Sequence, residues 1–168
     1  MAAGPVAGSV ISAPVTEDAA AFRDALPDGG VLLGLDLGSK TIGTALCDAG
    51  WSFATAGKTL PKGKFARDKA ALEALCKSRS VAGLVIGLPL NMDGSAGSRA
   101  QASRSFARNL AALELPVLLW DERWSTTSAE RDLIAQDVSR AKRAERIDSH
   151  AAAVILQGAI DRLTGGIL

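Results

Sequence analysis

Apolar residues along this chain form short continuous runs separated by stretches of helical periodicity, a pattern that predicts a mixed α/β fold. Residues 31–37, 83–88 and 116–120 are almost wholly apolar, as expected for strands that are buried on both faces. Two further strands are expected at about 41–48 and 51–60. The three strands nearest the N-terminus, at 31–37, 41–48 and 51–60, follow one another too closely for parallel pairing, which needs a long crossover. We therefore expect these three to pair antiparallel.

Helical periodicity fills most of the remaining chain. Helices are expected over 64–79, from Ser98 to about Leu113, over 128–136 and from about Ile147 to Leu163. The third of these begins with the capping box Thr127-x-x-Glu130, which satisfies free N–H groups at a helix start. Three closely spaced strands followed by alternating helices and strands predict an α/β fold, with a mixed five-stranded sheet flanked by helices.

The chain has 168 residues, about the size of one domain. Residues 1–14 are rich in Ala, Gly, Pro and Ser, and such a segment is expected to be mobile. Residues 16–26 have the pattern of a short helix with Thr16 as its N-cap. We therefore expect an N-terminal extension at 1–30, partly flexible with a short helix, and one folded domain at 31–168.

Composition narrows the class of protein. Hydrophobic residues make up 48% and aromatic residues 4%, so the core must be mainly aliphatic. The net charge is +1, and the extension holds four acids and one base (−3), so residues 31–168 carry +4. This excess permits nucleic-acid binding without requiring it.

Targeting and cysteine patterns exclude several classes. Cys47 and Cys76 lie in different predicted elements and have no Cys-x-x-Cys partner, which argues against a zinc site or a disulfide scaffold. No apolar run approaches the length of a membrane span, and the N-terminus lacks the pattern of a signal peptide. A cytoplasmic protein without membrane contact is expected.

Acids at the ends of two predicted strands are candidates for chemistry. Asp36 lies in an otherwise apolar strand, and burial of a lone carboxylate is unfavourable. It either binds metal or accepts hydrogen bonds from the turn 38–40. Asp121 and Glu122 follow another buried strand, at the edge where sites form in sheets with parallel units. They could equally solvate the strand end, and the pattern leaves open which of the two points inward.

A third acid, Asp148, opens the last predicted helix. The helix dipole alone favours an acid at that position. The alanines at 151–153 would let this helix approach the sheet closely and bring Asp148 toward the other acids. Mg²⁺ and Mn²⁺ prefer oxygen ligands, and two-metal nucleases place ions about 3.5–4 Å apart between shared carboxylates. Glu145 and His150 are weaker candidates, because one lies in a basic segment and the other on a different helical face.

Two glycine-containing segments are candidates for phosphate contact. Residues 36–43 have the Asp-x-Gly-Ser/Thr pattern of the phosphate loop in actin-like ATPases and sugar kinases, but those proteins pair two related domains. The loop 87–99 is longer than most strand-to-helix connections. Ser98 at its end suits phosphate binding by backbone amides, and Arg99 could pair with a second phosphate. An ordinary connection with Ser98 as N-cap is the alternative.

Basic and aromatic residues suggest further nucleic-acid contacts. The basic run at 140–146 is either a solvated surface or a track for a phosphate backbone. Trp51 and Trp124 could stack on bases, whereas Trp120 is expected in the core. The expected nucleic-acid contacts are Lys40, Arg99, Arg123, Trp124, Arg140, Lys142 and Arg143.

Five segments of the chain resemble, in order, the motifs of the YqgF/RuvX family, whose members are described as pre-16S rRNA nucleases and Holliday junction resolvases. The segments are GLDLGSKTIG (34–43), VIGLPLNMDGS (85–95), DERWSTT (121–127), DVSR (137–140) and IDSHAAAVILQ (147–157). The resemblance covers residues 31–163. It implies an RNase H-like fold and a metal-dependent nuclease that trims the 5′ end of the small-subunit rRNA precursor in the bacterial cytoplasm.

The same resemblance selects the site residues. The family's acids correspond to Asp36, Glu122 and Asp148, which favours Glu122 over Asp121. These three are the candidate catalytic and metal-binding residues, with Mg²⁺ or Mn²⁺ as the cofactor. Family members often have Leu where Trp124 stands, and position 150 is variable among them.

Competing functions remain open at this point. The first is a nuclease acting on pre-rRNA. The second is a Holliday junction resolvase acting on branched DNA, which would cut symmetrically as a dimer, and the sequence does not distinguish a monomer from a homodimer. The third is a non-catalytic RNA-binding ribosome-assembly factor whose carboxylates are retained for metal-dependent folding. An actin-like ATPase is a distant fourth.

Overall fold

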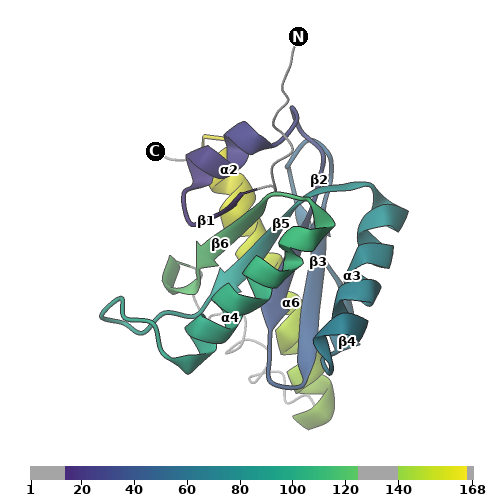
Figure 1. Ribbon diagram of the computed structural model, residues 1–168, viewed down its shortest axis with the longest axis vertical. Helices are drawn as coiled ribbons and strands as arrows, with labels where there is room; N and C mark the ends of the chain where they lie inside the picture. The colour runs from purple at the N-terminus through teal and green to yellow at the C-terminus, as the bar shows by residue number, and fades with distance from the viewer. Residues whose placement is uncertain (1–13, 125–139, 166–168) are drawn as a thin grey trace.

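The computed structural model describes residues 14–124 and 140–165, and of residues 124 and 140–148 it describes the backbone alone. Within these residues a six-stranded sheet has the order β1-β6-β5-β2-β3-β4 and carries helices on both faces (Figure 1). The strands are β1 (Val15–Thr16), β2 (Val31–Leu37), β3 (Thr41–Cys47), β4 (Ala54–Pro61), β5 (Val81–Leu88) and β6 (Val117–Asp121). The helices are α2 (Ala19–Ala25), α3 (Phe65–Arg79), α4 (Ser98–Asn109) and α6 (Arg140–Leu163), with the 3₁₀ turns η1 (Leu110–Leu113) and η2 (Glu122–Trp124).

Strand pairing follows from the lengths of the connections. β2, β3 and β4 pair antiparallel through short turns, whereas β5 and β6 join β2 in parallel. The helices α3 and α4 provide the crossovers that parallel pairing needs. The predicted α/β class and mixed sheet are confirmed. The number of strands differs from the predicted five, because β1 pairs parallel with β6, and a two-residue strand carries too little pattern to be recognised.

Each central strand contributes side chains to two separate cores, because successive residues point to opposite faces of a sheet. One core packs against α3 and α4 and includes Leu33, Leu35, Leu84, Ile86 and Leu119. The other packs against α2 and α6 and includes Leu32, Val85, Leu118, Ile155 and Leu156. Figure 1 shows α3 and α4 on the near side of the sheet and α6 behind it.

The N-terminal extension packs against the second core. The short helix predicted there is present as α2, but its N-cap is Asp18, whose carboxylate accepts a hydrogen bond from the N–H of Ala20 at 2.9 Å. Thr16, the predicted cap, lies instead in β1. Phe22 of α2 is fully buried. Residues 15–25 therefore add a strand to the sheet and a side chain to the core.

The last helix begins earlier than predicted. α6 starts at Arg140, seven residues before the expected start at Ile147. The basic segment that was expected to be a connection consists largely of Ala, Arg, Lys and Glu, which are strong helix formers. The helix predicted over 128–136 and its capping box lie outside the described residues. In the described part of the chain no helix is long and apolar enough to cross a membrane.

Candidate active site

Asp36 lies on the face of β2 that α6 covers. Leu35 and Leu37, its neighbours in sequence, pack on the opposite face. Gly34 shares the face of Asp36 by the two-residue period of a strand, and a Cβ there would lie 2.8 Å from the Cβ of Leu156 in α6. Asp36 is 9% exposed. A carboxylate buried to this extent is stable only with hydrogen-bonding or cationic partners.

Glu122 reaches the same face from the end of β6. The two strands are not neighbours, because β5 lies between them. A Cβ at Gly87 of β5 would lie 2.6 Å from Oε2 of Glu122 and 2.6 Å from Cδ1 of Ile155 in α6. The carboxylate of Glu122 therefore lies directly over the backbone of Gly87, beneath α6.

Gly87 also stands next to Asp36 in the sheet. Leu35 pairs with Ile86, so the following residues, Asp36 and Gly87, occupy adjacent strands about 4.8 Å apart. The absent side chain of Gly87 gives Glu122 room to extend over β5 toward Asp36. This geometry brings acids from two strands that are not adjacent onto the same face of the sheet, one strand apart.

Asp121, the other member of the acidic doublet, is engaged elsewhere. Its carboxylate accepts hydrogen bonds from the backbone N–H of Arg123 at 2.9 Å and from the guanidinium Nη2 at 2.7 Å. The hydrogen bonds from the Arg123 side chain lower the pKa of Asp121 below its usual range. Glu122 is thus the acid of the doublet that faces α6, in agreement with the sequence motif.

The backbone of α6 places position 148 at the level of Asp36. In the sheet, Asp36 pairs with Gly43, and Gly43 pairs with Thr59. The hydroxyl of Thr59 lies 2.5 Å from that of Ser149 in α6, so residue 148 is beside the same row. Since α6 begins at Arg140, position 148 is in its third turn. The alternative explanation of Asp148 as a helix-dipole acid is therefore wrong, because that effect is confined to the first turn.

The donor set at this place fits a divalent cation. Asp36 and Glu122 present carboxylate oxygens, which Mg²⁺ and Mn²⁺ prefer, and the Gly87 backbone leaves a cradle that a Cβ would fill. Among side chains that the structure describes, no three acids, cysteines or histidines gather closely enough to hold a metal. The side chain of Asp148, the third predicted ligand, lies outside that part, as does that of Glu145.

Arg123 links the end of β6 to the loop between β5 and α4. Its guanidinium donates to both carboxylate oxygens of Asp121 and, through Nη1, to the carbonyl of Met92 at 3.3 Å. This pairing raises the pKa of Arg123. The Arg123 side chain thus holds the loop against the strand that carries Glu122, and its predicted contact with nucleic acid stays a prediction.

The loop held by Arg123 is a tight polar turn. The Asn91 carbonyl accepts from the N–H of Gly94 at 2.8 Å, and Gly94 has a φ of 88°, which favours glycine. The carboxylate of Asp93 accepts hydrogen bonds from the hydroxyl and N–H of Ser95, and these lower its pKa. Met92 is 88% exposed at the tip. Gly94 therefore helps to build a closed turn, and the phosphate contact predicted for Ser98 and Arg99 stays a prediction.

The other predicted residues are placed as follows. Lys40 and Arg99 are exposed near the end of β2, and His150 is exposed on α6. Trp120 is buried as predicted. Trp51 is not available for base stacking, because it is buried and its Nε1 donates to the Gly30 carbonyl at 2.7 Å. The positions of Arg140, Lys142 and Arg143 lie in the first turn of α6, and their side chains and that of Trp124 are not described.

A known family matches most of this chain. The model of a family described as "RuvX: Holliday junction resolvase" matches residues 30–162. The chain belongs to the RuvX family. The match begins one residue before β2 and includes positions 36, 122 and 148, so all three candidate acids lie within the family region.

Curated RuvX-like relatives are similar over nearly their whole length. A protein of Novosphingobium aromaticivorans named "Putative pre-16S rRNA nuclease" is 64% identical over 151 residues, which is 90% of this chain and 97% of the relative. A relative of the same name from Sphingopyxis alaskensis is 65% identical over 150 residues, 89% of this chain and 99% of the relative. A Bradyrhizobium relative, also of that name, is 60% identical over 139 residues, 82% of this chain and 86% of the relative.

A solved structure supports the RNase H-like fold predicted for this RuvX family member. The chain is similar to T. thermophilus RuvC, solved in complex with a Holliday junction substrate, with a TM-score of 0.53 and 14% identity. The match covers 81% of this chain and 96% of that one. At this identity the similarity establishes the shared fold.

Sequence reasoning about this RuvX family chain missed three residues near the site. Gly87 was predicted to lie in the strand 83–88 and at the start of the loop 87–99, but no role was assigned to it, although a glycine inside an apolar strand signals a close approach of another group. Lys62 and Ser103 were not considered, yet both line a cavity beside the end of β2. No pattern in the sequence connects them, since they come from different elements.

Proposed function

We propose that this protein is a metal-dependent nuclease that hydrolyses phosphodiester bonds and processes the 5′ end of pre-16S rRNA in the cytoplasm. The observation that carries the proposal is the carboxylate of Glu122 over Gly87, one strand away from the buried Asp36. The names of the RuvX relatives from Novosphingobium and Sphingopyxis support the reaction and the substrate. The two cysteines, both free and buried, are compatible with a reducing compartment.

In this proposal the carboxylates are metal ligands of a two-metal site. Asp36, Glu122 and Asp148 would hold Mg²⁺ or Mn²⁺. The cations supply positive charge for the oxygens that attack and leave during an in-line displacement. The chain itself contributes fixed geometry. Asp36 is held in a buried strand, Glu122 is confined between Gly87 and α6, and Arg123 anchors the segment on which Glu122 lies.

Other residues of the chain would bind the nucleic acid. Lys40, Arg99 and the basic first turn of α6 would contact its backbone, and Trp124 would stack on a base.

The decisive experiment uses Asp36→Asn, which preserves shape and removes the negative charge. We expect cleavage of a pre-16S rRNA fragment in Mn²⁺ to fall at least about 100-fold, because even indirect disturbance of metal ligands often has that effect. RNA binding without metal should be retained. Equal cleavage by the wild type and this variant would refute the proposed site and point to contamination or to a non-catalytic binding protein.

Metal binding can be measured without any substrate. A ligand that binds only the folded state stabilises it by about 2.7 kcal/mol at a concentration 100 times its Kd. Mg²⁺ or Mn²⁺ should therefore raise the Tm of the wild type, and Asp36→Asn should remove most of that increase. A Tm of the wild type that does not change with either metal would contradict a carboxylate metal site.

A Holliday junction resolvase is the second candidate. The description of the family model favours it. The same wild-type and Asp36→Asn preparations should be assayed on a four-way DNA junction. Paired symmetric cuts, with dimers in solution, would favour this reading, and cleavage of pre-rRNA alone would exclude it.

A further inference from the structure

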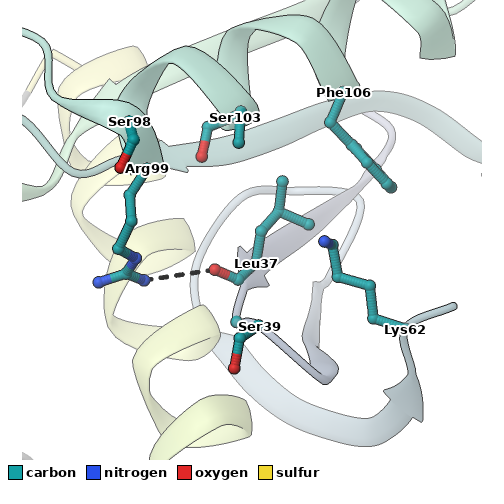
Figure 2. Close-up of a pocket in the computed structure, with 9 residues that line it drawn as sticks. Leu37, Ser39, Lys62, Ser98, Arg99, Ser103 and Phe106 are labelled. Carbon is teal, nitrogen blue, oxygen red and sulfur yellow. Dashed lines mark hydrogen bonds between the residues drawn. The ribbon is translucent and has the colours of Figure 1, made fainter.

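A small cavity lies at the carboxyl end of β2, on the side opposite to Asp36. Its volume is about 290 Å³, at the small end of the range for ligand sites. Leu37 and Phe106 form apolar parts of its lining, while Lys62, Arg99 and Ser103 contribute polar groups. Figure 2 shows the α4 side chains on one side of the cavity and Leu37, Ser39 and Lys62 on the other. Leu37, which lines the cavity, directly follows Asp36 in the sequence.

Two positive charges meet at this cavity. Lys62 directly follows β4, and its backbone N–H donates to the Lys40 carbonyl at 2.9 Å, which fixes it beside the β2–β3 turn. Arg99 is the second residue of α4, and its Nη2 donates to the Leu37 carbonyl at 3.4 Å. No acidic residue lines the cavity, and within the described ranges 14–124 and 140–165 neither cation forms an ion pair. A cavity with this charge favours an anion.

Ser103 of α4 directs its hydroxyl toward the same space. The residue is 3% exposed, and in Figure 2 its oxygen is directed into the cavity. Its hydroxyl forms no hydrogen bond with another residue in the part of the chain that is described. Among the described residues no buried side-chain polar atom lacks a partner, so the Ser103 oxygen is reached from the cavity, where it can form a hydrogen bond with an oxygen of a bound ligand.

The start of α4 adds donors that suit an anion. The helix has 12 residues, and its N-cap is Gly97, which supplies no side-chain hydrogen bond. The N–H groups of the first turn therefore have no intrahelical or capping partner. The positive end of the helix dipole points the same way. Ser98 and Arg99, at this first turn, both line the cavity.

We infer that this cavity binds one backbone phosphate of the nucleic acid, adjacent to the phosphate held at the acidic site. The inference rests on the proposed function. Asp36 and Leu37 point to opposite faces of β2, so a strand that passes over the end of β2 contacts both the acids and the cavity. Lys62, Arg99 and Ser103 bind phosphate oxygens, and Leu37 and Phe106 border the sugar. The cavity thereby positions the substrate.

Binding of a phosphate can first be tested without cleavage or metal. Uridine 5′-monophosphate and uridine differ by one phosphate, and each is titrated into the full-length protein in EDTA while backbone amide resonances are followed by NMR. The nucleotide should shift the amides of Gly38, Ser39, Ser98 and Arg99, and Lys62→Gln should weaken the effect. Equal responses to nucleotide and nucleoside would overturn the inference.

A single-stranded oligonucleotide tests whether the cavity binds a phosphate of the nucleic-acid backbone. Lys62→Gln and Arg99→Gln, each combined with Asp36→Asn to prevent cleavage, should weaken binding about three- to tenfold. The matched controls are Lys77→Gln, at the far end of α3, and Arg108→Gln, at the far end of α4. They remove the same charges from exposed positions outside the cavity and should change binding less than about twofold. Losses equal to those of the controls would overturn the inference.

A neutral methylphosphonate placed at each linkage in turn locates the contact. At one position it should weaken binding to the Asp36→Asn protein but not to the same protein with Lys62→Gln. If no position has this effect while uridine 5′-monophosphate still binds, the cavity takes free phosphate and the inference is wrong. Ser103→Ala should reduce binding about two- to fivefold, and because Ala is a better helix former than Ser, the loss cannot come from unfolding of α4.

Failure of this inference can be distinguished from failure of the proposed function. If Asp36→Asn abolishes cleavage while Lys62→Gln and Arg99→Gln retain the wild-type KM, the nuclease is supported and the phosphate cavity is refuted. If the wild type cleaves neither RNA nor DNA but the methylphosphonate pattern is found, the phosphate cavity is supported and the nuclease proposal is refuted.

Discussion

The two faces of the sheet use the same strands for different purposes. On the face under α3 and α4, β2 and β5 present large aliphatic side chains such as Leu35 and Ile86. On the face under α6, the residues immediately after these two are Asp36 and Gly87, where Glu122 also lies. Since successive side chains of a strand point in opposite directions, one strand supplies both the core and the site. Neighbours in sequence therefore do not share a role.

The small residues on the α6 face are what make this arrangement possible. A Cβ at Gly34 would meet Leu156 at 2.8 Å, and one at Gly87 would meet Ile155 at 2.6 Å. The buried alanine of α6 at position 152 faces the sheet in the same region. Close packing of α6 brings position 148 to the level of Asp36. The aliphatic face gives stability, and the small-residue face gives proximity.

The comparison of the two faces is tested most strongly by Leu84→Ala on the α3/α4 face. Leu84 is fully buried, and loss of a buried Leu side chain lowers the free energy of unfolding by about 2–5 kcal/mol. Cleavage per folded molecule should stay at the wild-type level. The measurements are urea unfolding and single-turnover cleavage at a temperature where the variant is folded. A large loss of activity by the folded variant would mean that the two faces are not separable.

A smaller effect is expected from Gly87→Ala on the α6 face. The new Cβ would lie 2.6 Å from Oε2 of Glu122 and from Cδ1 of Ile155. Displacement of the carboxylate should lower the cleavage rate about 10- to 100-fold, as misplacement by about 1 Å does at other sites. Stability should fall as well, because of the contact with Ile155.

The two contacts of that Cβ can be separated by a second substitution. Ile155→Val removes Cδ1, so Gly87→Ala/Ile155→Val should recover part of the lost stability while its activity remains low. Ile155→Val alone is the control and should destabilise by only about 0.5–1.5 kcal/mol. Recovery of activity together with stability would show that the contact with Glu122 is unimportant.

The smallest effect concerns the acid that faces away from the site. Because Arg123 lowers the pKa of Asp121 in the folded state, the ionised carboxylate stabilises the fold above its unfolded pKa of about 3.9. This contribution is lost as the pH falls through the lower folded pKa. Asp121→Asn should therefore be less stable than the wild type near neutral pH, and the difference should shrink as the pH falls below about 4. Unfolding curves measured across this range check it, and a difference independent of pH would argue against an ionised Asp121–Arg123 pair.

Several elements of the fold were predictable because their signals are local. Apolar runs located β2, β5 and β6, short connections predicted antiparallel pairing of β2, β3 and β4, and helical spacing located α3 and α4. The start of α6 was misplaced because a run of charged residues was taken as a connection, although Ala, Arg, Lys and Glu favour helix. Strand β1 was missed because two residues gain strand geometry only from their partner, β6.

The site divides in the same way. The sequence by itself determined which acids are unusual, since Asp36 in an apolar strand and the doublet after β6 stand out against their surroundings, and the family motifs selected Glu122. Only the tertiary structure decided how they approach. It inserts β5 between the two strands, and the glycine at position 87 leaves the space that Glu122 occupies. The size of that space depends on the packing distance between elements that are far apart in the chain. The hydrophobic pattern of the sequence indicates to which face a side chain points, but not which residues of other elements it contacts.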